Sequence, residues 1–232
     1  MDETTPKVLA FDVFGTVVDW HGSIAAEIAD RFPDVDAAEF ARAWRAGYQP
    51  AMASVAQSGE WVRLDDLHLQ ILRNVLSDFQ LSVDEAEAAE LNLVWHRLRP
   101  WPDSVEAIAR LRTRFTVVPL SNGNISLLSD MAKNAGIGWD AVLSAEIVRR
   151  YKPDPATYRS VGEIFGVPDS EVMMVAAHHD DLDGAAAAGL RTAYIERPNE
   201  YGEDRPKDVS GRAEHPLHFA DIAALARHLL AH

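Results

Sequence analysis

Four short stretches of this 232-residue chain place reactive polar side chains at or near the end of an apolar run. In chain order these side chains are Asp12, Ser121 with Asn122, Lys152 and Asp181. An acid at the tip of a β-strand, followed closely by a glycine such as Gly15, lies at the mouth of a parallel sheet, where open α/β sheets bind ligands. Asp12 on its own is equally well interpreted as the acid of a turn or a helix cap. The other three stretches favour a reactive carboxylate accompanied by a cation.

The order of these motifs, Asp then Ser then Lys-Pro then Asp, resembles that of the haloacid dehalogenase superfamily from about residue 7 to about residue 195. The resemblance implies an α/β fold, with a doubly wound, Rossmann-like parallel sheet and a nucleophilic aspartate after the first strand. Any one motif alone is a weak signal, whereas the four together are specific.

The elements that would position these side chains alternate between apolar strands and helices, which is typical of parallel β-α units. The expected strands cover residues 7–12, 116–120, 141–144, 172–176 and 192–195. The expected helices cover residues 101–115, 126–135, 155–165, 182–188 and 218–232. Residues 198–208 are expected to form a polar loop.

Residues 20–98 show no convincing strand pattern and carry apolar residues at helical spacing instead. We expect helices at about 22–31, 36–57, 65–79 and 84–97. An all-helical insertion after the first strand looks like the cap of this superfamily. The sequence therefore predicts a core domain of residues 1–18 and 99–232 and a helical cap domain of residues 19–98.

Two positions separate this chain from the Mg²⁺-dependent phosphotransferases that make up most of the superfamily. Those proteins carry a second acid two residues after the nucleophile, and here that position is Phe14. They also carry a metal-binding acid after the fourth strand, where this chain has Ala177. Because Mg²⁺ demands oxygen ligands, the sequence predicts no metal and no other cofactor.

The remaining pattern closely resembles the metal-free L-2-haloacid dehalogenases. The matching residues are Asp12, Phe14, Gly15-Thr16, Trp44-Arg45, Leu120 to Gly123, Tyr151 to Pro153 and Tyr158. The last motif departs from the family, because His178 stands where an asparagine is expected and Asp180 replaces an aromatic residue. That departure leaves the shape of the pocket wall and the preferred halogen open.

The resemblance implies hydrolytic dehalogenation of short 2-haloalkanoic acids, such as haloacetates, through an ester on Asp12. Lys152 would keep Asp12 ionised, and Asp181 would hold Lys152 and position water. Arg45 and Asn122 would cradle the leaving halide, where negative charge develops in the transition state. The supporting catalytic residues would be Thr16, Ser121 and Tyr158, and the substrate-binding residues would be Val13, Phe14, Trp61, Ser121 and His178.

Simpler interpretations stay open at this stage. Arg45 is also explained as a solvated helix arginine, residues 121–123 as a plain turn, and Trp61 as an anchor of the cap core. Two other functions compete with dehalogenation. One is a phosphatase-like hydrolase that holds Mg²⁺ in another way, and the other is a catalytically inactive module of the same superfamily.

The composition limits the partners. The formal net charge of −14 argues against nucleic acid and anionic membranes, and an anionic haloacid substrate would need local cations. There is no cysteine, which excludes disulfides and thiolate chemistry. No run approaches the ~20 apolar residues of a membrane span, and residues 1–7 lack an apolar signal core. We therefore expect a cytoplasmic protein, and a homodimer is a candidate assembly that the sequence does not prove.

Overall fold

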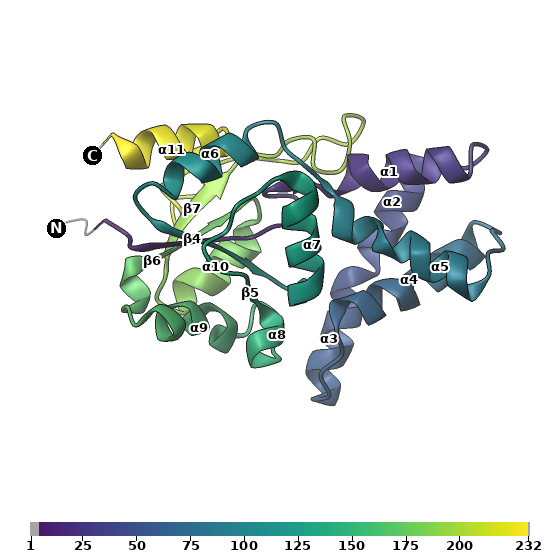
Figure 1. Ribbon diagram of the computed structural model, residues 1–232, viewed down its shortest axis with the longest axis horizontal. Coiled ribbons are helices and arrows are strands. Elements are labelled where there is room, and N and C mark those ends of the chain that lie inside the picture. Colours follow the sequence, from purple (N-terminus) through teal and green to yellow (C-terminus); the bar gives the residue numbers. More distant parts are fainter. Residues whose placement is uncertain (1–4, 232) are drawn as a thin grey trace.

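A six-stranded parallel sheet forms the centre of the computed structural model, which describes residues 5–231 (Figure 1). The strand order is β5-β4-β1-β6-β7-β8, so β1 lies between β4 and β6. The strands are β1 (Val8–Phe11), β4 (Thr116–Ser121), β5 (Leu143–Ser144), β6 (Val172–Ala176), β7 (Arg191–Ile195) and β8 (His218–Phe219). The expected doubly wound α/β core is confirmed. Residues 1–4, part of the segment expected to lack a signal core, lie outside the described residues.

Helices cover both faces of this sheet because successive strand side chains point to opposite sides. Leu9 and Phe11 belong to the apolar cluster shared with α6 (Ser104–Leu111), α7 (Ile125–Ala135) and α11 (Ile222–Leu230). Val8 and Ala10 pack with α9 (Pro155–Phe165) and α10 (His179–Ala187) on the other face. Two short helices, α8 (Ala145–Val148) and η2 (Asp169–Glu171), complete the core.

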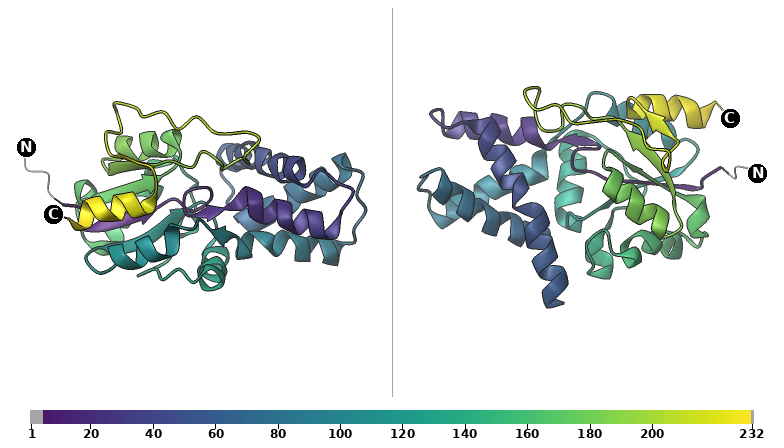
Figure 2. Two further views of the ribbon diagram at one scale, coloured as in Figure 1. Left: turned by 90° about the horizontal axis from the view of Figure 1, so that it is seen from above. Right: turned by 180° about the vertical axis from the view of Figure 1, so that it is seen from behind.

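The inserted segment is all helical and forms a body beside the sheet, as both views of Figure 2 show. Its helices are α1 (Trp20–Arg31), α2 (Ala37–Ala46), α3 (Tyr48–Ser58), α4 (Leu64–Asp78), α5 (Glu85–Asn92) and η1 (Leu93–Arg97). The single helix expected over residues 36–57 is wrong, because the chain breaks at Gly47 into α2 and α3. Pro50 has no N–H to donate to the carbonyl of Ala46, but it is tolerated in the first turn of a new helix.

The expected helix over residues 218–232 also needs correction at its start. His218 and Phe219 pair with Tyr194 and Ile195 and extend the sheet by one strand. The helix α11 begins only after Asp221, whose side chain accepts a hydrogen bond from the N–H of Ala224. Residue 232, the last of the expected helix, lies outside the described residues.

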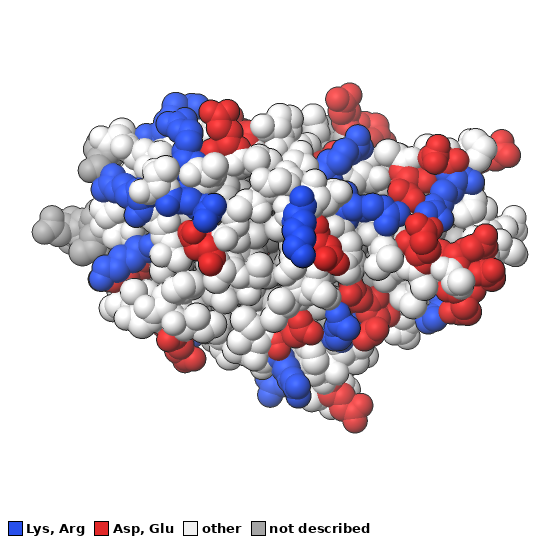
Figure 3. Space-filling view, in the orientation of Figure 1, with Lys and Arg blue, Asp and Glu red and all other residues white. Residues whose placement is uncertain are grey.

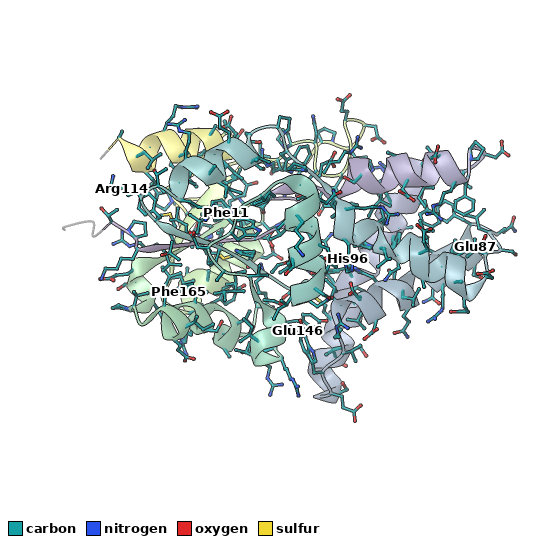
Figure 4. All side chains as sticks on the ribbon, viewed as in Figure 1. Phe11, Glu87, His96, Arg114, Glu146 and Phe165 are labelled. Atoms are coloured by element: carbon teal, nitrogen blue, oxygen red, sulfur yellow. The ribbon has the colours of Figure 1, made fainter. Side chains whose placement is uncertain are left out.

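A two-stranded ribbon marks where the chain leaves the sheet and returns to it. β2 (Val18–Asp19) pairs antiparallel with β3 (Arg99–Pro100), and this ribbon is where we place the proposed boundary between cap and core. A second contact between cap and core comes from His96 of η1, which is labelled in Figure 4. Its ring nitrogens lie within hydrogen-bond distance of Asp65 of α4 and Asp130 of α7. Among residues 5–231, no helix is both long and apolar enough to cross a membrane.

Candidate active site

Asp12 lies at the carboxyl end of the central strand β1. Its N–H donates to the carbonyl of Val175 at 3.0 Å, so the residue continues the β1–β6 ladder by one step. The chain then turns at Gly15, whose φ of +84° favours glycine. The turn leaves the Asp12 side chain at the sheet edge, only 7% exposed, beside the ends of β4 and β6.

Three side chains contact the Asp12 carboxylate. Lys152 Nζ lies 3.0 Å from Oδ1, and Thr16 Oγ1 donates to Oδ2 at 2.8 Å. His178 Nδ1 lies 3.1 Å from the same Oδ2. Burial alone raises the pKa of Asp12, but the charges of Lys152 and His178 outweigh it and hold that pKa well below its usual range. Asp12 is therefore an anion at neutral pH, which a carboxylate nucleophile must be.

Lys152 links this nucleophile to a second carboxylate. Its Nζ lies 2.6 Å from Asp181 Oδ2, and Tyr158 donates its hydroxyl to Asp181 Oδ1 at 2.8 Å. Burial lowers the pKa of Lys152, but the two carboxylates reverse this and raise it above its ordinary value. Burial and the charge of Asp12 raise the pKa of Asp181. Asn122 Oδ1 accepts a hydrogen bond from the backbone N–H of Lys152 at 2.8 Å, which holds the first residue of the Lys-Pro motif in place.

His178 reaches a carboxylate that sequence reasoning missed. Its Nε2 lies 2.8 Å from Oε1 of Glu200, a fully buried residue in the loop after β7. Burial lowers the pKa of His178, but Glu200 and Asp12 raise it to about 9. Burial raises the pKa of Glu200, but His178 and Lys207 lower it to about 2. Glu200 lies in a polar loop without periodicity, so no local pattern indicated it.

Arg45 enters from the cap, in the last turn of α2. Its guanidinium lies 4.1 Å from the centre of the Tyr48 ring and 5.7 Å from that of Trp20. Within residues 5–231, Arg45 Nη1 is buried and has no hydrogen-bond partner. A cationic donor held between aromatic rings with an uncommitted N–H is suited to bind an anion.

These groups converge on a cavity of about 1000 Å³ between the cap and the sheet edge. Of the expected site residues, those that line the cavity are Asp12, Phe14, Arg45, Asn122, Lys152, Tyr158, His178 and Asp181. The loop after β7 also reaches the cavity, through residues that include Tyr201, Arg205 and Lys207. Cap, sheet edge and loop therefore enclose one site.

Four expected residues do not line this cavity. Thr16 lies beneath it and acts through its bond to Asp12. Val13 is buried, and the hydroxyl of buried Ser121 accepts the N–H of Gly123 at 3.1 Å. Trp61 lies in a neighbouring cavity of about 410 Å³, with its ring tilted by 39° against that of Tyr151 and 4.6 Å between the ring centres. The structure therefore does not bring Trp61 to the wall of the main cavity.

The side chains around Asp12 do not suit Mg²⁺. Phe14 is a phenyl ring packed edge-to-face with Trp95 at 5.5 Å, and neither it nor Ala177 has a side-chain oxygen that could bind the metal. Two cations, Lys152 and His178, already contact the Asp12 oxygens. Since Mg²⁺ requires oxygen ligands, we derive no step through a metal.

Comparison of the chain with known proteins identifies several relatives. A model of the haloacid dehalogenase-like hydrolases matches residues 6–189. The chain is 44% identical to a solved defluorinating L-2-haloacid dehalogenase, with a TM-score of 0.91 and coverage of 97% of this chain and 95% of that one. A second solved L-2-haloacid dehalogenase is 38% identical, with a TM-score of 0.92 and coverage of 99% and 100%. Haloacetate dehalogenase H-2 of Moraxella sp. (strain B) is 27% identical over 199 residues, 84% of this chain and 87% of that protein.

Proposed function

The chain belongs to the L-2-haloacid dehalogenases of the haloacid dehalogenase-like hydrolases, and from this membership we propose that it converts short 2-haloalkanoic acids to 2-hydroxy acids. The enzyme is a hydrolase that acts on carbon–halide bonds. The observation that carries its substrate class is the buried Asp12 anion, which contacts Lys152 and lines the same cavity as Arg45. Haloacetates, fluoroacetate included, are the proposed substrates.

The first step is displacement of the halide. An Asp12 oxygen attacks the carbon that bears the halogen, the carbon–halogen bond breaks, and an ester forms on Asp12. Arg45 and Asn122 receive the leaving halide, since both line the cavity and a buried Nη1 of Arg45 has no hydrogen-bond partner among residues 5–231. Lys152 keeps Asp12 anionic before the attack.

The second step is hydrolysis of the ester. Water positioned by Asp181 attacks the carbonyl carbon of the Asp12 ester, and the bond from that carbon to the alkyl-bearing oxygen breaks. Tyr158 and Lys152 hold Asp181 in place for this task. The product is a 2-hydroxy acid, and Asp12 returns to a carboxylate.

Release of halide is the direct test. The purified protein should release chloride from chloroacetate and fluoride from fluoroacetate. For each substrate the rate should be the same with and without a chelator, because Phe14 and Ala177 replace the metal-binding acids. Loss of halide release in chelator, restored by Mg²⁺, would support the phosphatase-like alternative. Absence of halide release from every haloacid, with folded protein, would support an inactive module.

The source of the product oxygen tests Asp12 as the nucleophile. In a single turnover in heavy-oxygen water, with enzyme in excess, the first 2-hydroxy acid should carry no label, because its new oxygen comes from Asp12. Mass spectrometry should find the label in the peptide that contains Asp12. A labelled product with an unlabelled peptide would mean direct attack by water.

A cytoplasmic location and a homodimer stay predictions. Light scattering of the purified protein would decide the oligomeric state, and cell fractionation would decide the location.

A further inference from the structure

Glu200 is a buried charge that has no role in the displacement and hydrolysis steps of the proposed reaction. Its carboxylate is fully buried and accepts from His178 Nε2 at 2.8 Å, Trp20 Nε1 at 3.2 Å and Lys207 Nζ at 2.5 Å. A buried carboxylate is costly unless such donors compensate it. The loop therefore holds this charge directly behind the imidazole that contacts the nucleophile.

The same loop is fitted to the turn that follows Asp12. A Cβ added to Gly15 would lie 2.2 Å from Glu200 Oε1, so the carboxylate occupies the space that any side chain at position 15 would need. Arg197 donates its Nε to the carbonyl of Thr16 at 2.9 Å and pairs with both oxygens of Asp103. The yellow-green segment in Figure 2 shows this loop reaching from the core toward the cap. The position of Glu200 is thus set by the nucleophile turn itself.

The two oxygens of Asp12 differ in their donors. Oδ2 accepts from both Thr16 and His178, whereas Oδ1 contacts only Lys152 among the described residues. A carboxylate oxygen has about two lone-pair sites, so Oδ2 is saturated and Oδ1 keeps a free lone pair. Oδ1 is then the oxygen that forms the new bond to carbon, and Oδ2 becomes the carbonyl oxygen of the ester.

We propose that Glu200 is a positioning residue that holds His178 as a cation against Oδ2, so that His178 and Thr16 form the oxyanion hole for hydrolysis of the Asp12 ester. This inference rests on the proposed dehalogenase function. It adds a catalytic role for His178, which stands where an asparagine is expected, and a role for the loop that the sequence left unassigned.

The step balances without any further reactant. Water attacks Cγ of Asp12, and the carbonyl electron pair moves onto Oδ2, where two donors already point. The pair returns as the bond from Cγ to Oδ1 breaks. One water proton reaches the departing Oδ1 through Asp181, and the second leaves to solvent. His178 keeps its proton throughout, because its task is to stabilise charge.

The charges that face His178 set its pH dependence. Asp12 and Glu200 lie on its two nitrogens, with Lys152 beyond Asp12 and Lys207 beyond Glu200. Ester hydrolysis should therefore fall as pH rises past about 9, where His178 loses its proton. Replacing Glu200 with a neutral residue removes one anion and should move this fall to lower pH.

Rapid-mixing kinetics of Glu200→Gln with chloroacetate separate the two steps. The variant should release one equivalent of chloride per site at nearly the normal rate and then turn over about tenfold or more slowly, with the alkylated Asp12 peptide accumulating. His178→Ala should slow ester hydrolysis about 10²–10³-fold, as loss of an oxyanion donor typically does. His178→Asn should recover part of that rate without the fall near pH 9, since an amide donates but does not titrate.

A second Glu–His pair provides the matched control. Glu196 Oε1 lies 2.7 Å from His218 Nε2, in the same segment but outside the cavity. Glu196→Gln should change neither the ester hydrolysis rate nor its pH profile. Should Glu200→Gln fail to fold, nitrogen NMR of the wild-type imidazoles still decides the protonation state of His178.

Two results would overturn the inference. One is a His178 that is neutral at pH 7 in the wild-type protein. The other is folded Glu200→Gln and His178→Ala variants that hydrolyse the ester at the wild-type rate. Failure of the proposed function looks different, because the wild-type protein would then release no halide while the NMR titration of His178 would still be readable.

Discussion

The role of Arg45 depends on the side chains that surround it. On a helix surface its guanidinium would be solvated, but here Trp20 and Tyr48 flank it, and one of its nitrogens is buried without a hydrogen-bond partner in the part of the chain that the structure describes. Burying an unpaired donor is unfavourable, so a site that keeps one is built for a ligand that accepts hydrogen bonds. A halide leaving the substrate is such a ligand.

Replacing Arg45 with alanine should lower turnover, because an electrostatic stabiliser of the leaving group is lost. The activation barrier should rise by about 3–4 kcal/mol. Arg45→Lys should also fail largely, since an ammonium lacks the planar guanidinium that stacks on Tyr48. Steady-state halide release measures both. Arg73→Ala is the control, because Arg73 pairs with Glu85 on the exposed cap surface, away from the cavity lining. A near-normal Arg45→Ala enzyme would mean that Arg45 does not bind the halide.

At the scale of elements, the break between α2 and α3 shapes the cap side of the cavity. Arg45 lies at the end of α2 and Tyr48 begins α3, so the break at Gly47 allows the tyrosine ring to lie under the guanidinium. Gly47 also lets α4 approach closely. A Cβ at this position would lie 2.4 Å from Cγ2 of Ile71.

Gly47→Ala should therefore destabilise the protein by about 1–3 kcal/mol through overpacking, and it should lower turnover by displacing Tyr48. Urea denaturation measures the first effect and halide release the second. The double variant Gly47→Ala with Ile71→Ala should lose less stability than the sum of the two single changes, because the clashing methyl group is gone. Additive losses would show that Ile71 is not the obstacle.

The net negative charge of the whole protein repels an anionic substrate. The net charge is −14, and acidic side chains gather over the cap end of the face drawn in Figure 3, near α5. Among the described residues that line the cavity, cationic side chains outnumber acidic ones: the cations are Arg42, Arg45, Lys152, Arg205, Lys207 and Arg212, and the acids are Asp12, Asp180, Asp181 and Asp208. Local cations thus offset the repulsion of the surface.

The junction between cap and core carries a titratable contact. Burial lowers the pKa of His96, but its bonds to Asp65 and Asp130 outweigh burial and raise it. On the same side, Glu146 accepts the N–H of Ile125 and pairs with Arg63 of the segment before α4 (Figure 4). These contacts join the cap to the start of α7.

Because the pKa of His96 is raised in the folded protein, its stabilising contribution is full below the unfolded pKa of about 6.5 and is lost as pH rises through the folded value. His96→Gln should therefore cost about 1 kcal/mol or less at pH 6 and less still at pH 9. Urea denaturation of both proteins at the two pH values measures this. A cost that does not change with pH would show that the histidine acts without its charge.

The amino-acid sequence by itself determined the sheet and the residues at its edge. Apolar runs predicted that Asp12 directly follows one strand and that Asp181 follows another a few residues later, and parallel strands bring their carboxyl ends to the same edge of the sheet. The place of the strand ends is a consequence of local pattern and of parallel pairing, which a linear chain already encodes. The pairing of Lys152 with both acids was predicted from the resemblance to the dehalogenase family, and its Nζ lies 3.0 Å from Asp12 and 2.6 Å from Asp181.

Only the tertiary structure decided which distant segments complete the site. Glu200 and Lys207 come from a loop without periodicity, and their role depends on contacts with His178 and the turn at Gly15. Trp61 lies in the neighbouring cavity because the packing of α3 beside residues 149–154 places it there. Such positions follow from how separate elements pack, and no local sequence pattern specifies that packing.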